Sequence, residues 1–270
     1  MNASLAFSPQ AAEIGAVVVA NDAVNADYRL LVLACGAPAT GARPGQFFQL
    51  LCPPADGEPF LRRPMSVYGA DPAAERVEFL YKVTGLGTRG LATLRAGDTA
   101  NIFGPLGNGF TIDPGTRHIA IAGRGVGLAT LAPLALAARA RGIEVTAILS
   151  ARAAEFVMSE TMFLSAGADV IAVIDTDGTS DVANVEVIVR GLIAERGTGA
   201  LYTCGSARLM RMLQRVAAET GIRGEVALEQ QMACGLGMCF CCVREFRTTA
   251  GIVHKRVCWN GPVFDLGEAL

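Results

Sequence analysis

The sequence has few histidines and little charge of either sign. Of its 270 residues only two are histidine, and aspartate, glutamate, lysine and arginine together make up 18%. With so little histidine, we do not expect a site built on imidazole acid–base chemistry, and any chemistry is expected to depend on bound cofactors. A net charge of −2 without a basic run also argues against a nucleic-acid partner.

Long hydrophobic runs are also lacking, although 51% of the residues are apolar. The longest apolar run, 126–138, is flanked by Arg124 and Arg139 and is too short to cross a bilayer, so no membrane span is predicted. The first ten residues have no basic segment before an apolar core, and no signal peptide is expected. We therefore expect a cytoplasmic protein. Its apolar content indicates either a large interface with another subunit or simply an alanine- and glycine-rich composition.

The spacing of the apolar runs changes along the chain. Six short runs separated by turn residues predict an antiparallel β-barrel, interrupted by one short helix within 86–94. Four strands that alternate with helices then predict a doubly wound parallel sheet of the nucleotide-binding type, and the last fifty residues lose this alternation. We predict a multidomain β plus α/β protein with a Greek-key β-barrel at 12–112, an α/β domain at 113–225 and a small cysteine-rich module at 226–270.

Half of the eight cysteines lie in one segment, M-A-C-G-L-G-M-C-F-C-C. Cys234, Cys239 and Cys242 have the spacing C-x4-C-x2-C, and Cys258 follows after fifteen residues, a pattern typical of plant-type [2Fe–2S] centres. The sequence therefore predicts a cluster held by these four thiolates. Zinc is the main alternative, although zinc sites more often use paired short knuckles and commonly include histidine. A set of buried structural thiols is the remaining alternative.

The residues around the predicted ligands agree with a tight metal-binding loop. Gly235 and Gly237 permit the backbone to wrap a cluster and to direct N–H groups toward its sulfurs. Cys241 lies between two predicted ligands and is interpreted as a small filler of the loop. Cys35 and Cys52 lie in predicted barrel strands, where a buried free thiol is ordinary.

Two segments of the predicted barrel contain residues suited to a phosphorylated cofactor. In R-R-P-M-S, 62–66, the planar fork of an arginine can pair with two pyrophosphate oxygens. The segment L-Y-K-V-T-G-L-G-T, 80–88, ends at Gly87 and Thr88, which open a short helix whose N-terminus suits an anion. Tyr81 either packs against a flavin or adenine ring or faces the barrel core.

A glycine-rich turn, A-G-R-G-V-G, joins the first strand of the α/β domain to its helix. Gly123, Gly125 and Gly127 would let a phosphate or a second ring approach the backbone, with the helix dipole behind them. Ser150 and Arg152 follow the second strand. They either hold a 2′-phosphate and favour NADPH or form a solvated helix start.

These motifs stand in an order that resembles the electron-transfer subunits of two-subunit, NAD-linked dihydroorotate dehydrogenases, within the ferredoxin–NAD(P)+ reductase superfamily. The resemblance covers nearly the whole chain and rests on R-R-P-x-S, L-Y-x-V-x-G-x-G-T, G-P-L-G-N-G-F, C-G, M-A-C-G-x-G-x-C-x-x-C and C-x-x-G-P-V-F. It implies an NAD(P)H oxidoreductase that passes electrons through FAD and a [2Fe–2S] cluster to a partner subunit. No acid–base catalytic residue is required.

The resemblance also implies roles for individual residues. FAD would be held by Arg63, Pro64, Met65, Ser66, Leu80, Tyr81, Lys82, Gly87 and Thr88. NAD(H) or NADP(H) would be held by Gly123, Gly125, Gly127, Cys204 and Gly205, and the cluster by Cys234, Cys239, Cys242 and Cys258. The chain departs from the family pattern at the dinucleotide site, where Arg124 replaces a glycine, Ser206 replaces a proline and the stretch after the third strand reads D-T-D-G-T-S-D-V-A.

Three functions are compatible with the sequence. The first is a dihydroorotate dehydrogenase subunit that pairs with an FMN-containing catalytic subunit in a hetero-oligomer. The second is a reductase of the same build that serves another partner, such as an oxygenase or a different flavoprotein. The third is a non-catalytic, zinc-bearing interaction module on a degenerate reductase fold.

Overall fold

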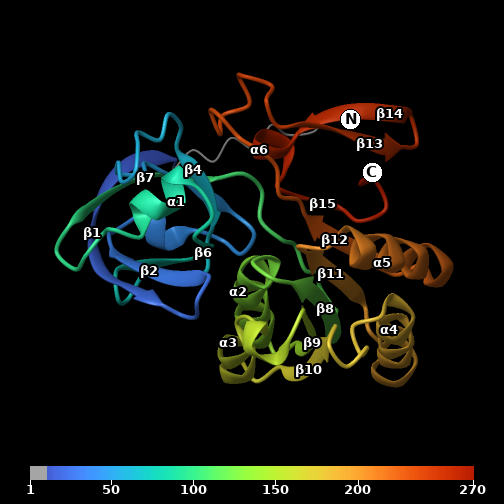
Figure 1. The fold of residues 1–270 in the computed structure, drawn as a ribbon. Helices are drawn as coiled ribbons and strands as arrows, with labels where there is room; N and C mark the ends of the chain where they lie inside the picture. Colours follow the sequence, from blue (N-terminus) through green and yellow to red (C-terminus); the bar gives the residue numbers. More distant parts are fainter. Residues whose placement is uncertain (1–10) are drawn as a thin grey trace. The chain divides into compact units, whose positions relative to one another are not determined.

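The structure is a computed structural model that describes residues 11–270 (Figure 1). The first ten residues, for which no signal peptide was expected, lie outside the described part. The chain forms two compact units. Of the described residues, the first unit contains 11–109 with Gln230–Val243 and Lys255–Pro262, and the second contains Phe110–Glu229, Arg244–His254 and Val263–Leu270. The predicted C-terminal module is thus shared between the two units, and the three domain boundaries stay a prediction.

The first unit is built on a curled antiparallel sheet of seven strands in the order β4-β3-β7-β1-β2-β6-β5 (Figure 1). The strands are β1 (Ala12–Ala23), β2 (Tyr28–Ala34), β3 (Phe47–Leu50), β4 (Arg63–Ser66), β5 (Gly69–Asp71), β6 (Arg76–Lys82) and β7 (Thr99–Leu106). One turn of 3-10 helix (Ala39–Gly41) and helix α1 (Leu86–Leu91) interrupt them. The antiparallel architecture is confirmed, and the six predicted strands are present. The additional strand, β5, is only three residues long, too short to show an alternating pattern.

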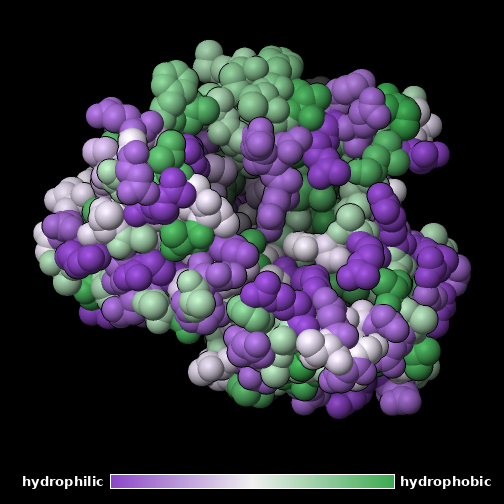
Figure 2. All heavy atoms as spheres, in the orientation of Figure 1, coloured by the Kyte–Doolittle hydropathy of each residue, from purple (hydrophilic) through white to green (hydrophobic). Residues whose placement is uncertain are grey.

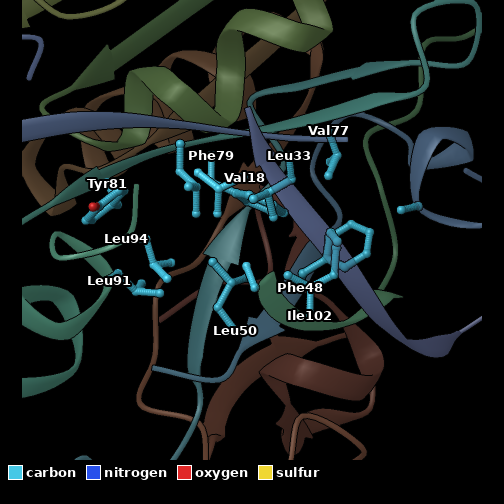
Figure 3. Close-up of a cluster of buried hydrophobic side chains, with 14 of the residues drawn as sticks. Val18, Leu33, Phe48, Leu50, Val77, Phe79, Tyr81, Leu91, Leu94 and Ile102 are labelled. Atoms are coloured by element: carbon cyan, nitrogen blue, oxygen red, sulfur yellow. The ribbon is translucent and has the colours of Figure 1, made fainter. Parts of the chain in front are cut away.

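Alternating apolar residues of these strands fill the inside of the curled sheet (Figure 3). Phe48 and Phe79 pack edge to face with ring centroids 5.5 Å apart. Tyr81 is 1% exposed in the same cluster, and its hydroxyl donates a hydrogen bond to Asn21 Oδ1 at 3.0 Å. Burial of each large side chain contributes about 1.5–3 kcal/mol, so this core holds the strands that carry the predicted FAD residues.

The second unit contains a six-stranded sheet in the order β10-β9-β8-β11-β12-β15. Its strands are β8 (His118–Arg124), β9 (Glu144–Ala151), β10 (Asp169–Ile174), β11 (Ala200–Cys204), β12 (Arg223–Ala227) and β15 (Val263–Asp265). The pairs are parallel except for the antiparallel pair of β12 with β15. The predicted doubly wound sheet is confirmed, but the last two strands were not predicted, because they lie where the strand–helix alternation of the sequence ends.

Helices cover both faces of this sheet (Figure 1). They are α2 (Gly127–Arg139), α3 (Glu160–Ser165), α4 (Val182–Arg196) and α5 (Ala207–Thr220), with a 3-10 turn at Ala154–Phe156. The chain then forms the hairpin of β13 (Val243–Thr248) and β14 (Gly251–Arg256) and the short helix α6 (Val257–Asn260). No helix among residues 11–270 is both long enough and apolar enough to cross a membrane.

One of the two histidines is buried at the start of β8. His118 is 1% exposed, with Nδ1 2.8 Å from Thr198 Oγ1 and Nε2 2.9 Å from Thr146 Oγ1. Burial, with the nearby positive charge of Arg196, lowers the pKa of His118 below its usual 6.5. A neutral imidazole between two hydroxyls satisfies both ring nitrogens, so the folded chain favours the uncharged form.

We expect this histidine to make the protein less stable in mild acid. Because its pKa is lower in the folded than in the unfolded chain, its contribution is complete above about pH 6.5 and decreases as the pH falls through that value, by about 1.4 kcal/mol per unit of pKa difference. Thermal unfolding between about pH 7.5 and about pH 5 should therefore show a smaller loss of Tm for His118→Gln than for the wild type.

The other histidine provides a matched control. His254 is exposed on β14, so His254→Gln tests whether the loss of any histidine gives the same result. Parallel Tm curves for the wild type and His118→Gln would contradict the expectation.

Candidate functional site

The four cysteines predicted to bind a cluster come together within the first unit, from the loop before β13 and from α6. Cys242 Sγ lies 3.2 Å from Cys258 Sγ, and the thiol of Cys239 is hydrogen-bonded to Cys234. The cysteines therefore form two pairs. Among residues 11–270 no three histidine, cysteine or acidic side chains are arranged around one point as a mononuclear metal site requires.

Two pairs of thiols fit a two-iron cluster better than a single zinc ion. In a [2Fe–2S] centre held by four cysteines, each iron takes two thiolates and shares the two sulfides. A structural zinc ion instead needs four donors around one position. The donor set of this loop therefore favours the predicted cluster over the zinc alternative.

Backbone N–H groups of the loop are directed at the cysteine sulfurs. The N–H of Leu236 donates to Cys234 Sγ at 3.3 Å, and that of Gly237 donates to Cys258 Sγ at 3.2 Å. The N–H of Cys258 donates to Cys242 Sγ at 3.4 Å. Such bonds stabilise thiolates and bound sulfur, as the sequence predicted for this loop.

The two glycines of the loop are required by its backbone conformation. Gly235 and Gly237 have φ of +70° and +75°, in the left-handed region that side chains other than glycine rarely adopt. A Cβ atom on Gly237 would also lie 2.9 Å from Cβ of Trp259. The prediction that these glycines shape the loop is confirmed.

The loop also changes how readily its thiols ionise. Burial opposes ionisation of Cys234, but hydrogen bonds from Cys239 and from the backbone of its neighbours outweigh burial and lower the pKa of Cys234 to about 7. Burial, and the hydrogen bond and charge of Cys242, raise the pKa of Cys258 to about 12. Because a metal ligand must be a thiolate, Cys258 needs the positive charge of a metal to ionise at neutral pH.

The other cysteines lie outside these pairs. Cys241 is exposed, and its Sγ lies 3.8 Å from the carbonyl oxygen of Gln231. Cys52 is buried in the core of the curled sheet, and Cys35 packs against that core. These positions agree with the interpretation of Cys241 as a filler and of the two barrel thiols as structural.

The two predicted FAD segments of the first unit meet at the start of α1. A Cβ atom on Gly87 would lie 2.7 Å from Arg63 Nε, so the arginine side chain covers the glycine. The hydroxyl of Thr88 accepts the N–H groups of Thr84 and Gly85 at 2.8 and 3.1 Å. Thr88 thus shapes the start of the helix, and the Arg63 guanidinium is the cationic group beside it.

The remaining predicted FAD residues do not all face this point. The ring of Tyr81 lies in the core, as in the predicted alternative in which it faces the inside of the barrel. It is therefore not available to stack on a flavin. Met65 also packs against the core. Lys82 forms an ion pair with Asp27 at 3.2 Å. Leu80 is buried, and Pro64 and Ser66 are half-buried in β4. The roles of all of these residues toward FAD stay predictions.

The predicted dinucleotide residues lie at the carboxyl edge of the second unit's sheet. A Cβ atom on Gly127 would lie 2.5 Å from the carbonyl carbon of Cys204, and one on Gly205 would collide with the carbonyl oxygen of Arg124. The turn that contains Gly123, Gly125 and Gly127 therefore packs directly against the end of β11. Burial raises the pKa of the Cys204 thiol far above its ordinary value, so this thiol stays protonated.

Arg124 spans three strands at this edge. Its guanidinium donates to Ser150 Oγ at 2.8 Å and to the two carboxylate oxygens of Asp175 at 2.9 and 2.5 Å. The hydrogen bonds from Arg124 and from Ser180 lower the pKa of Asp175 to about 2. Sequence reasoning did not single out Asp175, although it directly follows the third parallel strand, whose end lies at the same edge as Arg124.

The Arg124–Asp175 pair also bears on Ser150 and Arg152, the two residues that the sequence suggested as ligands of a 2′-phosphate. Ser150 is buried under Arg124, and the guanidinium of Arg152 lies over the ring of Phe156, 3.8 Å from its centroid. These contacts favour the alternative of a solvated helix start, since Arg152 is exposed there. Ser206, which replaces the family's proline, caps α5 by accepting the N–H of Leu209 at 3.3 Å.

Comparison with known proteins agrees with the cysteine loop. Residues 229–269 match the model of the iron–sulfur cluster binding domain of dihydroorotate dehydrogenase B. The electron transfer subunit of dihydroorotate dehydrogenase B (NAD(+)) from Desulforamulus reducens is 33% identical over 224 residues, which covers 83% of this chain and 85% of the relative. The subunit of the same name from Caldanaerobacter subterraneus is 35% identical over 227 residues, covering 84% and 87%.

Solved structures agree with the fold. A chain of the NADH-dependent reduced ferredoxin-NADP oxidoreductase, described for flavin-based electron bifurcation, superposes with a TM-score of 0.78 at 27% identity, covering 94% of this chain and 88% of that one. The ferredoxin reductase of carbazole 1,9a-dioxygenase, with a TM-score of 0.64 at 20% identity, shares the fold. The fold and the cysteine loop thus define an iron–sulfur electron-transfer reductase of the ferredoxin reductase class. Within that class, the chain belongs to the family of dihydroorotate dehydrogenase B electron transfer subunits.

The two thiol pairs predict different effects for neighbouring cysteines. Cys242→Ser removes one member of the buried pair and should abolish the visible absorption of the cluster. Cys241→Ser alters an exposed thiol bonded to a carbonyl oxygen and should leave that absorption nearly intact. The measurement is the visible spectrum with iron and acid-labile sulfide content, and equal losses in both variants would refute the ligand assignment.

Proposed function

We propose that this protein moves electrons between a nicotinamide dinucleotide and a partner redox subunit, through FAD and a [2Fe–2S] cluster. Its family is that of dihydroorotate dehydrogenase B electron transfer subunits, and we infer that its partner is an FMN-containing catalytic subunit. The observation that carries the proposal is the loop of two thiol pairs, with N–H groups directed at the sulfurs, on a reductase fold.

When bound, FAD exchanges two electrons with the dinucleotide as a hydride, and the cluster exchanges them one at a time. The protein provides positions and electrostatics for this exchange. Arg63 would pair with the FAD pyrophosphate beside the start of α1. Cys234, Cys239, Cys242 and Cys258 would hold the cluster, and the turn after β8 would receive the dinucleotide.

The surface of the cysteine loop suits a partner. Met238 and Phe240, on either side of Cys239, are 78% and 61% exposed, and Figure 2 shows hydrophobic side chains gathered over the loop that leads into β13. Arg256 lies over the Phe240 ring, 5.0 Å from its centroid, and holds it in place. Exposed apolar side chains are typical of interaction sites, and this group lies beside a predicted cluster ligand. We propose that the catalytic subunit docks here in a hetero-oligomer.

A second candidate differs only in the partner. The bifurcating oxidoreductase chain is similar over 94% of this protein at 27% identity, so the same build also serves a different electron circuit. The Arg124–Asp175 pair, at the edge where the dinucleotide is expected, is the local feature that favours this candidate.

We also propose a cytoplasmic location. None of the eight cysteines forms a disulfide, and two of them, Cys239 and Cys241, are exposed. Exposed thiols beside a cluster persist in a reducing compartment and are oxidised outside it.

The FAD assignment predicts a difference between two adjacent arginines. Arg63→Ala should weaken FAD retention by about tenfold to about a hundredfold, because charge-assisted hydrogen bonds to pyrophosphate contribute about 1.5–3 kcal/mol. Arg62→Ala is the control, since Arg62 is engaged by Glu13 and Asn101, each at 2.6 Å. FAD content after gel filtration is the measurement. Equal retention of FAD in both variants would contradict the proposed contact between Arg63 and the pyrophosphate.

The proposed function is tested on the chain purified with its partner. In the complex with the catalytic subunit, both NADH and dihydroorotate should produce the electron paramagnetic resonance signal of the reduced cluster. A co-purified partner that does not oxidise dihydroorotate, with reduction of the cluster by NADH but not by dihydroorotate, would instead support the second candidate. Zinc in place of iron and acid-labile sulfide would overturn both.

A further inference from the structure

A glutamine in the first unit is buried without hydrogen-bond partners. Gln49 of β3 is 1% exposed, and within residues 11–270 neither its Nε2 nor its Oε1 has a partner. Buried side-chain amides are nearly always satisfied in native proteins, so an orphaned one points to a group that is bound beside it. The sequence offered no signal for this residue, because a lone glutamine in an apolar strand has no motif.

Gln49 lies between the predicted FAD strand and the cysteine loop. On β3 its neighbour Phe48 points into the core, so the alternation of the strand directs Gln49 to the opposite face. On the neighbouring strand β4 its partner in the register is Pro64 of the R-R-P-M-S motif. A Cβ atom on Gly235 would lie 2.9 Å from Gln49 Nε2, so the amide rests against the backbone that follows Cys234.

The chemistry of this position favours a sulfur acceptor. Loop N–H groups already donate to Cys234 and Cys258, and the N–H of Cys258 in α6 donates to Cys242, so backbone donors gather around these sulfurs. The Gln49 amide packs against Gly235, the residue after Cys234, and so adds a donor to this set from the side of β3. Cluster sulfurs become more negative on reduction, and an N–H donor stabilises the reduced form.

We propose that Gln49 is a positioning residue of the iron–sulfur site, whose Nε2–H donates a hydrogen bond to sulfur on the Cys234 side of the cluster and raises its reduction potential. The inference rests on the proposed function, because it requires the cluster. It goes beyond that function in assigning a barrel residue, next to the predicted FAD strand, to the tuning of the cluster.

The test is a redox titration of the full chain with its cofactors bound. Gln49→Leu should keep its iron, sulfide and FAD, while the cluster becomes harder to reduce by about tenfold in the reduction equilibrium, or about 59 mV for one electron. Gln46→Leu is the matched control. Gln46 is also buried, but its Oε1 accepts from the Arg43 N–H at 2.8 Å and its Nε2 donates to the Gly107 carbonyl at 2.9 Å. Its replacement should lower stability without moving the cluster potential.

The possible outcomes distinguish a failure of the Gln49 role from a failure of the proposed electron-transfer function. An unchanged cluster potential in Gln49→Leu, with the cluster intact, overturns the inference and indicates a buried water as the partner. A shift of the flavin potential alone also overturns it and makes FAD the partner. If the wild-type chain contains no iron and sulfide, the proposed function itself is refuted.

A second measurement does not depend on how the variant folds. In reduced wild-type protein labelled with 15N in glutamine side chains, pulsed electron paramagnetic resonance should detect a coupling between the cluster and a glutamine amide nitrogen. The same coupling should persist in Gln46→Leu. Its absence from the wild type overturns the inference.

Discussion

The iron–sulfur loop depends on one constraint: its backbone must turn N–H groups inward toward cysteine sulfurs. Two such bonds reach Cys234 and Cys258, and a third, from the Cys258 N–H of α6, reaches Cys242. Each bond to an ionised acceptor contributes about 1.5–3 kcal/mol. The turn needs left-handed glycines at Gly235 and Gly237, and the carbonyl of Gly237 is held in turn by Arg256 at 2.8 Å. Burial opposes ionisation of Cys234 and Cys258, and these N–H groups act against burial by favouring the thiolate forms that bind metal.

The same constraint links the loop to the barrel. Because Gly235 has no side chain, the backbone after Cys234 lies directly against Gln49 of β3, and β3 is paired with the strand that carries Arg63. The predicted FAD strand, the orphaned amide and the first predicted ligand are therefore consecutive neighbours in one compact unit. Short distances between redox groups need such a rigid support, and the core around Phe48 and Phe79 provides it.

The second unit shows how departures from a family pattern are accommodated. Ser206 takes the place of a proline and makes a helix cap. Arg124 takes the place of a glycine and is neutralised by Asp175, a carboxylate that follows β10. Each change is stabilised locally, so the sheet and the backbone contact between Gly127 and Cys204 are preserved. These substitutions alter the polar character of the edge where the dinucleotide is expected.

The sequence by itself determined the order of the two architectures, nearly all of their elements, the cysteine spacing and the glycines of the loop. These are local signals, because strand alternation, helix periodicity and ligand spacing each lie within a few residues. Only the tertiary structure decided that Tyr81 faces the core, that Arg124 reaches Asp175 and that β12 and β15 extend the sheet. It also decided that Gln49 meets Gly235. Each of these depends on strand register and on packing between residues far apart in the chain, which a local pattern does not encode.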